Sequence, residues 1–405
     1  MRILRRRIGR RRFVPKRHRP PDGSKNRFGM ENPMNKPNQK LGFGLMRMPL
    51  TNADDPTSVD FGQVCTMVDT FLERGFTYFD TAYMYHNGVS EEIAGRALVD
   101  RHPRASFTLT TKLPVVMLKS EADNERIFSD QLRKCHVSYF DYYLLHCLTK
   151  ENFEKAERLH CFEFVQRLKA EGKVKCVGFS FHDTADVLEQ ILRAHPEIEF
   201  VQLQINYLDW EDPQVQSRLC YEVCEKYGKP VIVMEPVKGG TLASIPAAAE
   251  ALMKEACPDA SVASWAVRYA ASRPSVFVVL SGMSTLGQLL DNTSYMRSFR
   301  PLSAQEEKIC EQAARIIRDK TEIACTGCAY CTEGCPRHIA IPKYFALYNE
   351  WEREGRKNDA PARYAALTKE FGKASDCIRC RQCERHCPQH LPITKYLESV
   401  ARGME

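Results

Sequence analysis

The sequence lacks any run of eighteen predominantly apolar residues, so we expect no segment that spans a membrane. It also lacks the early apolar stretch that marks a protein for secretion. The chain has seventeen cysteines, and in a reducing cytoplasm those outside metal sites stay free thiols. We therefore predict a cytoplasmic protein, and its 405 residues predict two or three structural units.

Acidic residues are scarce at the start of the chain. Residues 1–29 contain twelve Lys or Arg against the single acid Asp22, an excess larger than the net charge of +7 of the whole chain, so the remainder is net acidic. A basic run of this kind can bind nucleic acid or anionic lipid. We instead expect residues 1–35 to form a disordered tail, to which we assign no function, and we expect no specific nucleic-acid partner.

A glycine-rich dinucleotide fingerprint is also missing, because the only early Gly-x-Gly pair, Gly42 and Gly44, lacks the third glycine and the following helix. From Leu41 to about Pro301, short apolar runs alternate with longer amphipathic segments, which is typical of a parallel β/α array. The eight candidate strands are 41–48, 76–82, 107–113, 141–146, 174–180, 200–207, 230–234 and 276–280. They predict a (β/α)8 TIM barrel over residues 36–301, with a doubly wound sheet as the alternative.

Eight cysteines near the C-terminus form two copies of one pattern, Cys325-x2-Cys328-x2-Cys331-x3-Cys335-Pro336 and Cys377-x2-Cys380-x2-Cys383-x3-Cys387-Pro388. This spacing is typical of paired [4Fe-4S] clusters, in which the fourth cysteine of each run binds the other cluster. We therefore predict one cluster on Cys325, Cys328, Cys331 and Cys387, and a second on Cys377, Cys380, Cys383 and Cys335. The alternatives are zinc knuckles or disulfides, although zinc sites usually use two separated cysteine pairs.

The segments around these cysteines have helical patterns. We predict a charged helix over 303–321 and two helices, 343–353 and 361–371, between the cysteine runs. Residues 302–405 should therefore form a mainly helical, ferredoxin-like domain with two [4Fe-4S] clusters, rather than a compact β-rich one.

Four candidate catalytic residues, Asp80, Tyr85, Lys112 and His146, fall at or just past the C-terminal ends of predicted strands, where barrel active sites are built. A free tyrosine has a pKa near ~10, so a nearby charge must tune it before it can donate a proton to a developing alkoxide. Lys112 can supply that charge, with Asp80 as its carboxylate partner and His146 aiming the substrate carbonyl. Tyr85 is the expected proton donor.

In this order the four residues resemble the tetrad of the aldo/keto reductase family, over residues 41 to about 300. The resemblance implies reversible reduction of an aldehyde or ketone with a nicotinamide cofactor. It also implies that Ser180 and Gln202 hold the nicotinamide carboxamide and that Met234 replaces a stacking aromatic residue. Phe181 replaces a usual asparagine, and we expect His182 beyond it to be a helix-entry residue near the N-cap Asp183.

The loop from Ser281 to Ser284 leads into a predicted helix that runs toward Asn292, so its N–H groups could cradle a phosphate. We therefore expect Ser281, Gly282 and Asn292 on the cofactor side of the site. Relatives that use NADP place Lys and Arg around this loop, whereas this chain has Gly282 and Gln288. NADPH, NADH and a flavin consequently all stay open as cofactors.

The whole chain resembles iron–sulfur members of the aldo/keto reductase group. The resemblance implies an oxidoreductase that acts on a small carbonyl compound and exchanges electrons through its clusters, with a redox partner protein. The alternative is a catalytically quiet nucleotide-binding barrel that serves a larger enzyme as a redox-responsive module.

Overall fold

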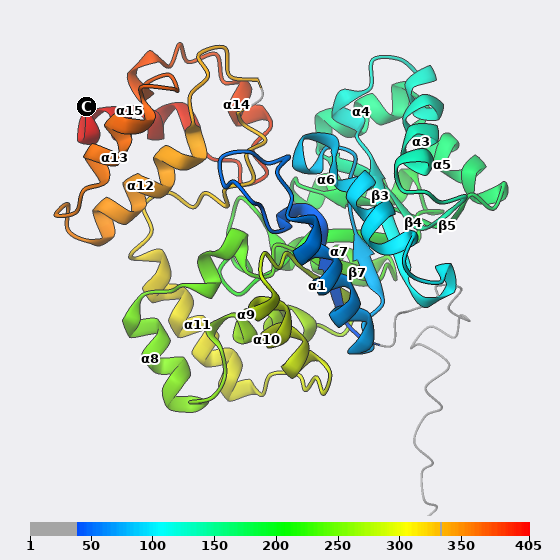
Figure 1. Ribbon diagram of the computed structural model, residues 1–405, viewed down its shortest axis with the longest axis horizontal. Helices are drawn as coiled ribbons and strands as arrows, with labels where there is room; N and C mark the ends of the chain where they lie inside the picture. Colours follow the sequence, from blue (N-terminus) through cyan, green and yellow to red (C-terminus); the bar gives the residue numbers. More distant parts are fainter. Residues whose placement is uncertain (1–38, 333) are drawn as a thin grey trace, which may run out of the picture. The chain divides into compact units, whose positions relative to one another are not determined.

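The computed structural model describes residues 39–332 and 334–405, and its first part is a closed barrel of eight parallel strands (Figure 1). The strands are β1 Leu41–Gly44, β2 Tyr78–Asp80, β3 Thr108–Leu113, β4 Phe140–Leu148, β5 Val174–Phe181, β6 Phe200–Gln204, β7 Val231–Met234 and β8 Val276–Ser281. All eight predicted strands are confirmed, and closure of the sheet between β1 and β8 rules out the doubly wound alternative. The predicted tail, 1–35, lies outside the described residues.

Helices surround the strands. They are α1 Phe61–Glu73, α2 Ser90–Ala94, α3 Ala122–Lys134, α4 Lys150–Arg158, α5 Cys161–Ala170, α6 Ala185–Ala194, α7 Ser217–Lys226, α8 Ala247–Ala256, α9 Val262–Ala271 and α10 Leu286–Met296. Each strand is buried along almost its whole length, as expected for parallel strands covered by helices on the outside and packed side chains inside. The strands and the inner faces of these helices, except α8, form one continuous apolar core.

The next helix, α11 (Ala304–Arg318), begins with a capping box between Ser303 and Glu306. Its buried residues, among them Ile309, Ala313 and Ile317, recur at helical spacing. They form a core cluster with α8 and α9, so this helix packs on the barrel, as the yellow ribbon beside α8 in Figure 1 shows. An amphipathic pattern shows that one face of a helix is buried but not which element covers that face, and for this reason the sequence alone groups α11 with the C-terminal domain.

The remaining residues form a helical domain of α12 (Ile341–Arg353), α13 (Ala360–Leu367), α14 (Gln382–Arg385) and α15 (Ile393–Met404). Proline lies in the first turn of both α12 and α13, where its missing N–H leaves no helical bond unmade. The domain has its own apolar core, which runs from Ile323 to Met404 and includes Cys331 and Cys383. The predicted mainly helical character is confirmed.

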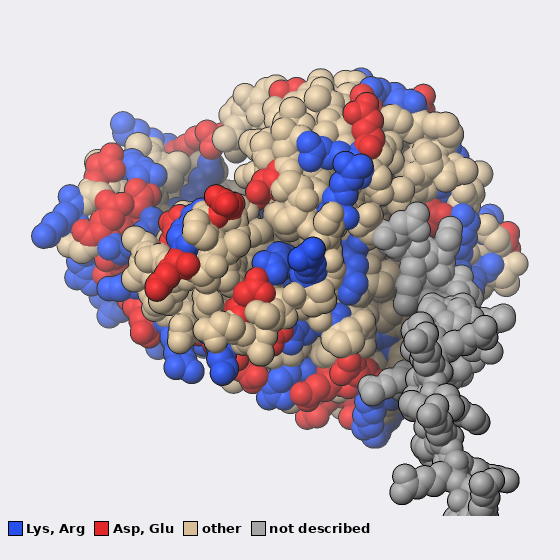
Figure 2. All heavy atoms as spheres, turned by 90° about the horizontal axis from the view of Figure 1, so that it is seen from below, with Lys and Arg blue, Asp and Glu red and all other residues tan. Residues whose placement is uncertain are grey.

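None of the helices in the described ranges is long and apolar enough to cross a membrane. On the face seen in Figure 2, Lys and Arg are interspersed with Asp and Glu among broad uncharged areas.

Candidate functional site

The four tetrad residues come together at the C-terminal end of the barrel. Asp80 ends β2, Lys112 lies on β3, His146 lies on β4, and Tyr85 begins a short helical turn after β2. Directly after His146 the pairing of β4 with β5 shifts register, and Cys147 has a positive φ of 61°. A bulge of this kind redirects the neighbouring side chain, here that of His146, at the rim of the barrel.

Lys112 is the centre of the tetrad. Its Nζ donates to Asp80 Oδ1 at 2.6 Å, to the carbonyl oxygen of Thr81 at 2.8 Å and to Tyr85 Oη at 3.2 Å. The ring of Tyr85 meets that of His146 edge-on, with centroids 5.9 Å apart. The lysine side chain is fully buried, so its three donors must be used inside the protein, and all three are.

Burial sets the protonation of the tetrad. It raises the pKa of Tyr85 well above its ordinary value, and the Asp80 charge adds to this, so Tyr85 keeps its proton at neutral pH. Burial together with the Lys112 charge holds the pKa of His146 well below its ordinary value, so the ring is neutral. Burial raises the pKa of Asp80 and lowers that of Lys112, while the ion pair between them opposes both shifts.

Several buried polar atoms around the tetrad have no hydrogen-bond partner among the described residues. They include Asp80 Oδ2, His146 Nδ1, His182 Nδ1 and Gln202 Oε1. Unsatisfied buried acceptors and donors are rare in proteins, and a group of them beside a cavity is typical of a ligand site. These atoms can take up the polar groups of a substrate or cofactor.

The predicted cofactor residues are only partly brought together. Ser180, Gln202, Met234 and Gly282 line one cavity with Asp80, Tyr85 and His146, which we call the barrel cavity. Gln202 Nε2 donates weakly to Met234 Sδ at 3.5 Å, and Ser180 Oγ accepts from the backbone N–H of Cys147 at 2.8 Å. Ser281 and Asn292 do not line this cavity. Asn292 Nδ2 instead donates a hydrogen bond to Ser281 Oγ at 2.8 Å.

The loop after β8 offers few free donors in this conformation. The N–H of Ser284 donates to Gln288 Oε1 at 2.7 Å, and the side chain of Arg47 lies against Gly282. The helix beyond begins as expected, with Thr285 as the N-cap of α10. The expected N-cap Asp183 is wrong by one residue, because α6 begins after Thr184 and the Asp183 carboxylate instead accepts from the N–H groups of Lys150 and Thr184.

The C-terminal domain covers the barrel cavity. We call Cys325–Cys331 the inner loop, because its residues Thr326, Cys328 and Tyr330 line the barrel cavity beside the tetrad. The Tyr330 ring lies edge-on to His146 with centroids 6.5 Å apart, and Arg47 donates to the carbonyl oxygen of Thr326 at 3.0 Å. The barrel cavity is consequently small, about 90 Å³.

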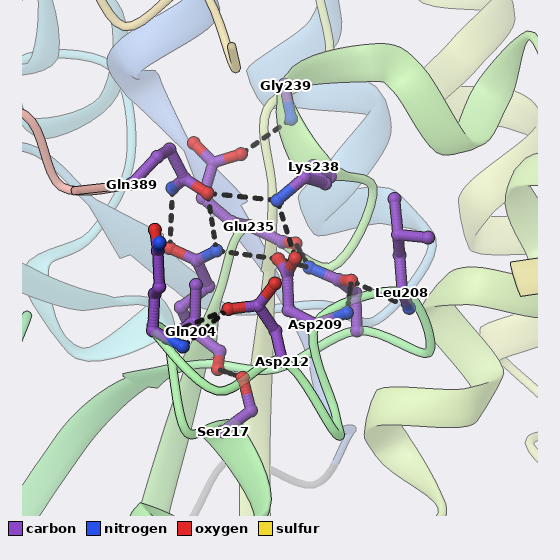
Figure 3. A network of polar contacts seen from close by, with 12 residues as sticks. Gln204, Leu208, Asp209, Asp212, Ser217, Glu235, Lys238, Gly239 and Gln389 are labelled. Carbon is purple, nitrogen blue, oxygen red and sulfur yellow. Dashed lines mark hydrogen bonds and ion pairs between the residues drawn. The ribbon is translucent and has the colours of Figure 1, made fainter. Parts of the chain in front are cut away.

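A buried polar network, drawn in Figure 3, fixes this contact. Lys238 Nζ donates to Asp209 Oδ1 at 2.5 Å and to Gln389 Oε1 at 2.9 Å, and Gln389 exchanges amide hydrogen bonds with Gln204 at 2.8 and 3.0 Å. Gln389 follows Cys387 and Pro388 in the C-terminal domain, whereas the other three residues belong to the barrel. Because the Lys238 and Asp209 side chains are only 4% and 3% exposed, the network depends on complete pairing.

A second cavity, about 300 Å³, adjoins the first and is called the loop cavity. Both cavities share His146, His182, Tyr330 and Pro388. Its barrel side includes Met84, Val116, Met117, Thr149 and Asn152, and its other side includes Arg385, His386, Cys387 and His390. A substrate that reaches His146 through this cavity would contact both domains.

The eight C-terminal cysteines line two small cavities. One is lined by Cys325, Cys328, Cys331 and Cys387, and the other by Cys335, Cys377, Cys380 and Cys383. In the first, the N–H of Gly327 donates to Cys325 Sγ at 3.4 Å. Burial raises the pKa of Cys387 above its ordinary value, and hydrogen bonds from the backbone N–H groups of Leu391 and Gln389 oppose this shift. Within the described ranges, no three His, Cys, Asp or Glu side chains form a site for a single metal ion.

Sequence reasoning missed the residues that join the two domains, above all Tyr330, Gln389 and Lys238. Tyr330 is a spacer residue of the cysteine pattern, and Lys238 follows the strand β7 without any recognisable motif. Lys and Gln buried at a domain contact have no local signature, because only the tertiary arrangement pairs them.

Comparisons with known proteins agree with this architecture. Residues 40–315 match the model of the aldo/keto reductase family, and residues 324–391 match a 4Fe-4S dicluster domain. An uncharacterized oxidoreductase of Bacillus subtilis, YqkF, is 26% identical over 314 residues, covering 70% of this chain and 92% of the relative.

Among solved structures, the aldo-keto reductase AKR11C1 from Bacillus halodurans superposes with a TM-score of 0.55 at 23% identity, covering 69% of this chain and 94% of that one. An aldo-keto reductase from Klebsiella pneumoniae in complex with NADPH gives a TM-score of 0.51 at 21% identity, covering 67% and 90%.

Proposed function

The chain belongs to the aldo/keto reductase family, and from this premise we propose that it reduces a small aldehyde or ketone reversibly at Tyr85, with electrons exchanged through two [4Fe-4S] clusters. One observation carries the proposal. Cys328 lines both the barrel cavity, with Tyr85 and His146, and the cavity of Cys325, Cys331 and Cys387. A ligand beside the tetrad would therefore lie next to a cluster ligand.

The tetrad supports the proton-transfer half of the reaction. Tyr85 keeps its proton at neutral pH and receives a hydrogen bond from Lys112, so it can donate that proton to an alkoxide forming in the barrel cavity. Neutral His146 can donate a hydrogen bond to the carbonyl oxygen and orient it. Asp80 keeps Lys112 charged, which stabilises the tyrosinate that remains.

A nicotinamide fits one end of the barrel cavity. The unpartnered Gln202 Oε1 can accept from the carboxamide NH₂ group, and Met234 lies beside Gln202 where the ring would pack. When bound, a reduced nicotinamide supplies the hydride. At the phosphate end the fit is poorer, because the N–H of Ser284 is already bonded and Arg47 covers Gly282. Binding of a dinucleotide would require Arg47 to move.

Two [4Fe-4S] clusters fit the cysteine cavities. Each cavity presents four thiols, and the lining supports the crossed arrangement, with Cys387 beside Cys325, Cys328 and Cys331, and Cys335 beside Cys377, Cys380 and Cys383. A cluster of this kind supplies one electron at a time, whereas a nicotinamide supplies two together. A flavin in the barrel cavity would bridge this difference, and we keep it as an alternative cofactor. The nine cysteines outside the cysteine cavities are all free thiols, which favours a reducing, cytoplasmic location.

The test is anaerobic turnover of a panel of aldehydes and ketones by the cluster-loaded protein and its Tyr85→Phe variant. Loss of general acid catalysis should lower kcat by ~10²–10⁴-fold while nucleotide binding persists. Tyr83→Phe is the matched control, because the Tyr83 hydroxyl donates to Asp130 outside the barrel cavity. A loss below about threefold in Tyr85→Phe would contradict the assignment.

A second candidate function is a catalytically quiet barrel that serves as a redox-responsive module. It is favoured by the small barrel cavity, about 90 Å³, and by Tyr330 and Arg47, which close it. Titration with NADH and NADPH at nucleotide, flavin and cluster wavelengths separates the candidates. Nucleotide binding that changes the cluster spectrum without turnover of any carbonyl would support the quiet barrel.

A further inference from the structure

The inner loop has a structural counterpart in Cys377–Cys383, which we call the outer loop. In both loops the residues on either side of the middle cysteine have left-handed backbone, with φ of 67° at Gly327 and 64° at Ala329, and of 57° at Arg379 and 58° at Arg381. The histidine three residues after the last cysteine of each run, His338 or His390, has a φ of 50° in both runs. The two cysteine runs therefore repeat the same backbone conformation.

The side chains of the two loops differ in what they contact. Inner-loop residues pack on the barrel, where the carbonyl oxygen of Thr326 accepts from Arg47 and Tyr330 lies beside His146. In the outer loop Cys380 is exposed, and Ile378 at 59% is the most exposed large apolar side chain among the described residues. One cysteine cavity consequently faces the barrel, and the other opens toward solvent.

Arginine at the first left-handed position of the outer loop is the strained choice. A Cβ disfavours this conformation, and the inner loop avoids the strain there with Gly327, where the outer loop has Arg379; at the second position Ala329 and Arg381 both carry a Cβ. The Arg379 and Arg381 side chains are nevertheless 69% and 73% exposed and contribute no buried packing. Their presence is better explained by an interaction outside the chain than by stability.

The charge around the outer loop is positive. Arg379 pairs with Glu398 at 3.0 Å and Arg381 with Glu384 at 3.8 Å, but exposed pairs of this kind are weak. Arg337 lines the outer cysteine cavity and donates to the backbone carbonyl oxygen of Asp376. Because this acceptor is neutral, the bond does not compensate the positive charge of Arg337. Arg337 and Arg381 thus line the same cavity as the exposed Ile378 and Cys380.

We propose that this surface, made of Arg337, Ile378, Arg379, Cys380 and Arg381 and called the outer face, docks an acidic one-electron carrier protein. The proposal rests on the proposed function in requiring a cluster behind Cys380. An apolar centre with a charged rim is typical of protein interfaces, and opposite charges speed association and select the partner. In each encounter the reduced carrier loses one electron and the cluster gains it, without a bond or proton changing place.

The direct test measures binding of a plant-type [2Fe-2S] ferredoxin, which is acidic, to the full-length cluster-loaded protein by anaerobic calorimetry. The test variant Arg379→Gly with Arg381→Ala copies the two inner-loop residues and removes the left-handed strain at residue 379, so iron content should stay unchanged. We expect its Kd to rise tenfold or more at low ionic strength, with cluster reduction by ferredoxin slowed in stopped-flow. Wild-type affinity should fall as salt is added.

The matched control is Arg126→Ala with Arg133→Ala, which removes two exposed arginines of α3 that each pair with an aspartate three residues earlier. The Kd of this control should stay within twofold of wild type. An unchanged Kd in the outer-face variant, or an equal loss in the control, overturns the proposal. So does tighter binding to basic cytochrome c or to duplex DNA than to ferredoxin.

If the test variant loses iron, Ile378→Ser keeps all three charges and should weaken binding about threefold, and an unchanged Kd in that variant also overturns the proposal. Small-molecule reduction by dithionite should proceed equally in every variant, since it needs no docking. Failure of carbonyl turnover would refute the proposed function alone and would leave these binding measurements intact.

Discussion

The inner and outer loops share one backbone conformation, but the inner loop packs on the barrel and the outer loop is exposed. We call the inner loop together with residues 387–390 the inner half, and the outer loop together with residues 335–338 the outer half. Arg47 bonds the inner loop and Lys238 bonds Gln389 of the same half, whereas the outer loop exposes Ile378 and two arginines. Two loops with one cysteine pattern thus differ in their surroundings, because the residues between the cysteines decide what each loop contacts. The inner half faces the barrel cavity, and the outer half faces solvent.

The largest effects should follow from removing the fourth cysteine ligand of each proposed cluster. Cys387→Ser should damage the inner cluster and Cys335→Ser the outer one, although each residue follows the other loop in sequence. Iron and sulfide analysis with electron paramagnetic resonance should show loss of one cluster in each variant. Damage to the outer cluster in Cys387→Ser would contradict the crossed arrangement that the two cysteine cavities support.

The next largest effect concerns the network that only the inner half possesses. Lys238→Met leaves the buried Asp209 carboxylate without its cation, which typically costs 3–5 kcal/mol. Arg337 occupies the outer position equivalent to Gln389 and is exposed, so Arg337→Met should change the free energy of unfolding by less than about 0.5 kcal/mol. Anaerobic urea unfolding of the cluster-loaded proteins measures both. Equal values would remove the energetic difference between the halves.

Two neighbouring glycines test whether the inner loop packs on the barrel. Gly239 and Gly240 both have positive φ, 64° and 104°, so alanine at either position introduces strain of roughly 1–2 kcal/mol. Only at Gly239 would the new Cβ meet the inner loop, 2.1 Å from the carbonyl oxygen of Thr326. Gly239→Ala should therefore lose a further ~1–3 kcal/mol, seen as a lower Tm than that of Gly240→Ala. A Tm equal in both would show that the inner loop does not pack there.

The barrel and its tetrad were predictable, whereas the contact between the domains was not. Alternation of apolar runs with amphipathic segments locates eight strands, and parallel strands all end on one face, so residues such as Asp80 and His146 had to lie near each other. Nothing in the cysteine spacing distinguishes the inner loop from the outer one, since both have the same pattern. Tyr330 and Gln389 gain their roles only from tertiary packing, as does α11 from its partner helices.

The smallest effect expected is the pH dependence that His182 contributes to the free energy of unfolding. His182 lies between the two domains, and burial, with the nearby His390 charge, lowers its pKa from 6.5 to about 3. Between these values the unfolded chain binds more protons than the folded one, so the free energy of unfolding falls as pH falls from 6.5. Because one pKa unit corresponds to about 1.4 kcal/mol and the ring is partly exposed, we expect a loss of about 1 kcal/mol between pH 6.5 and 5.

His182→Asn should reduce this slope by that amount, since an amide does not titrate, while buried His146 still contributes a slope of the same sign. His338→Asn, at the outer position equivalent to His390, should leave the slope unchanged. Chemical unfolding at pH 6.5, 5.75 and 5 under anaerobic conditions gives the three slopes. Equal slopes in wild type and His182→Asn would mean that burial between the domains does not lower the pKa of His182.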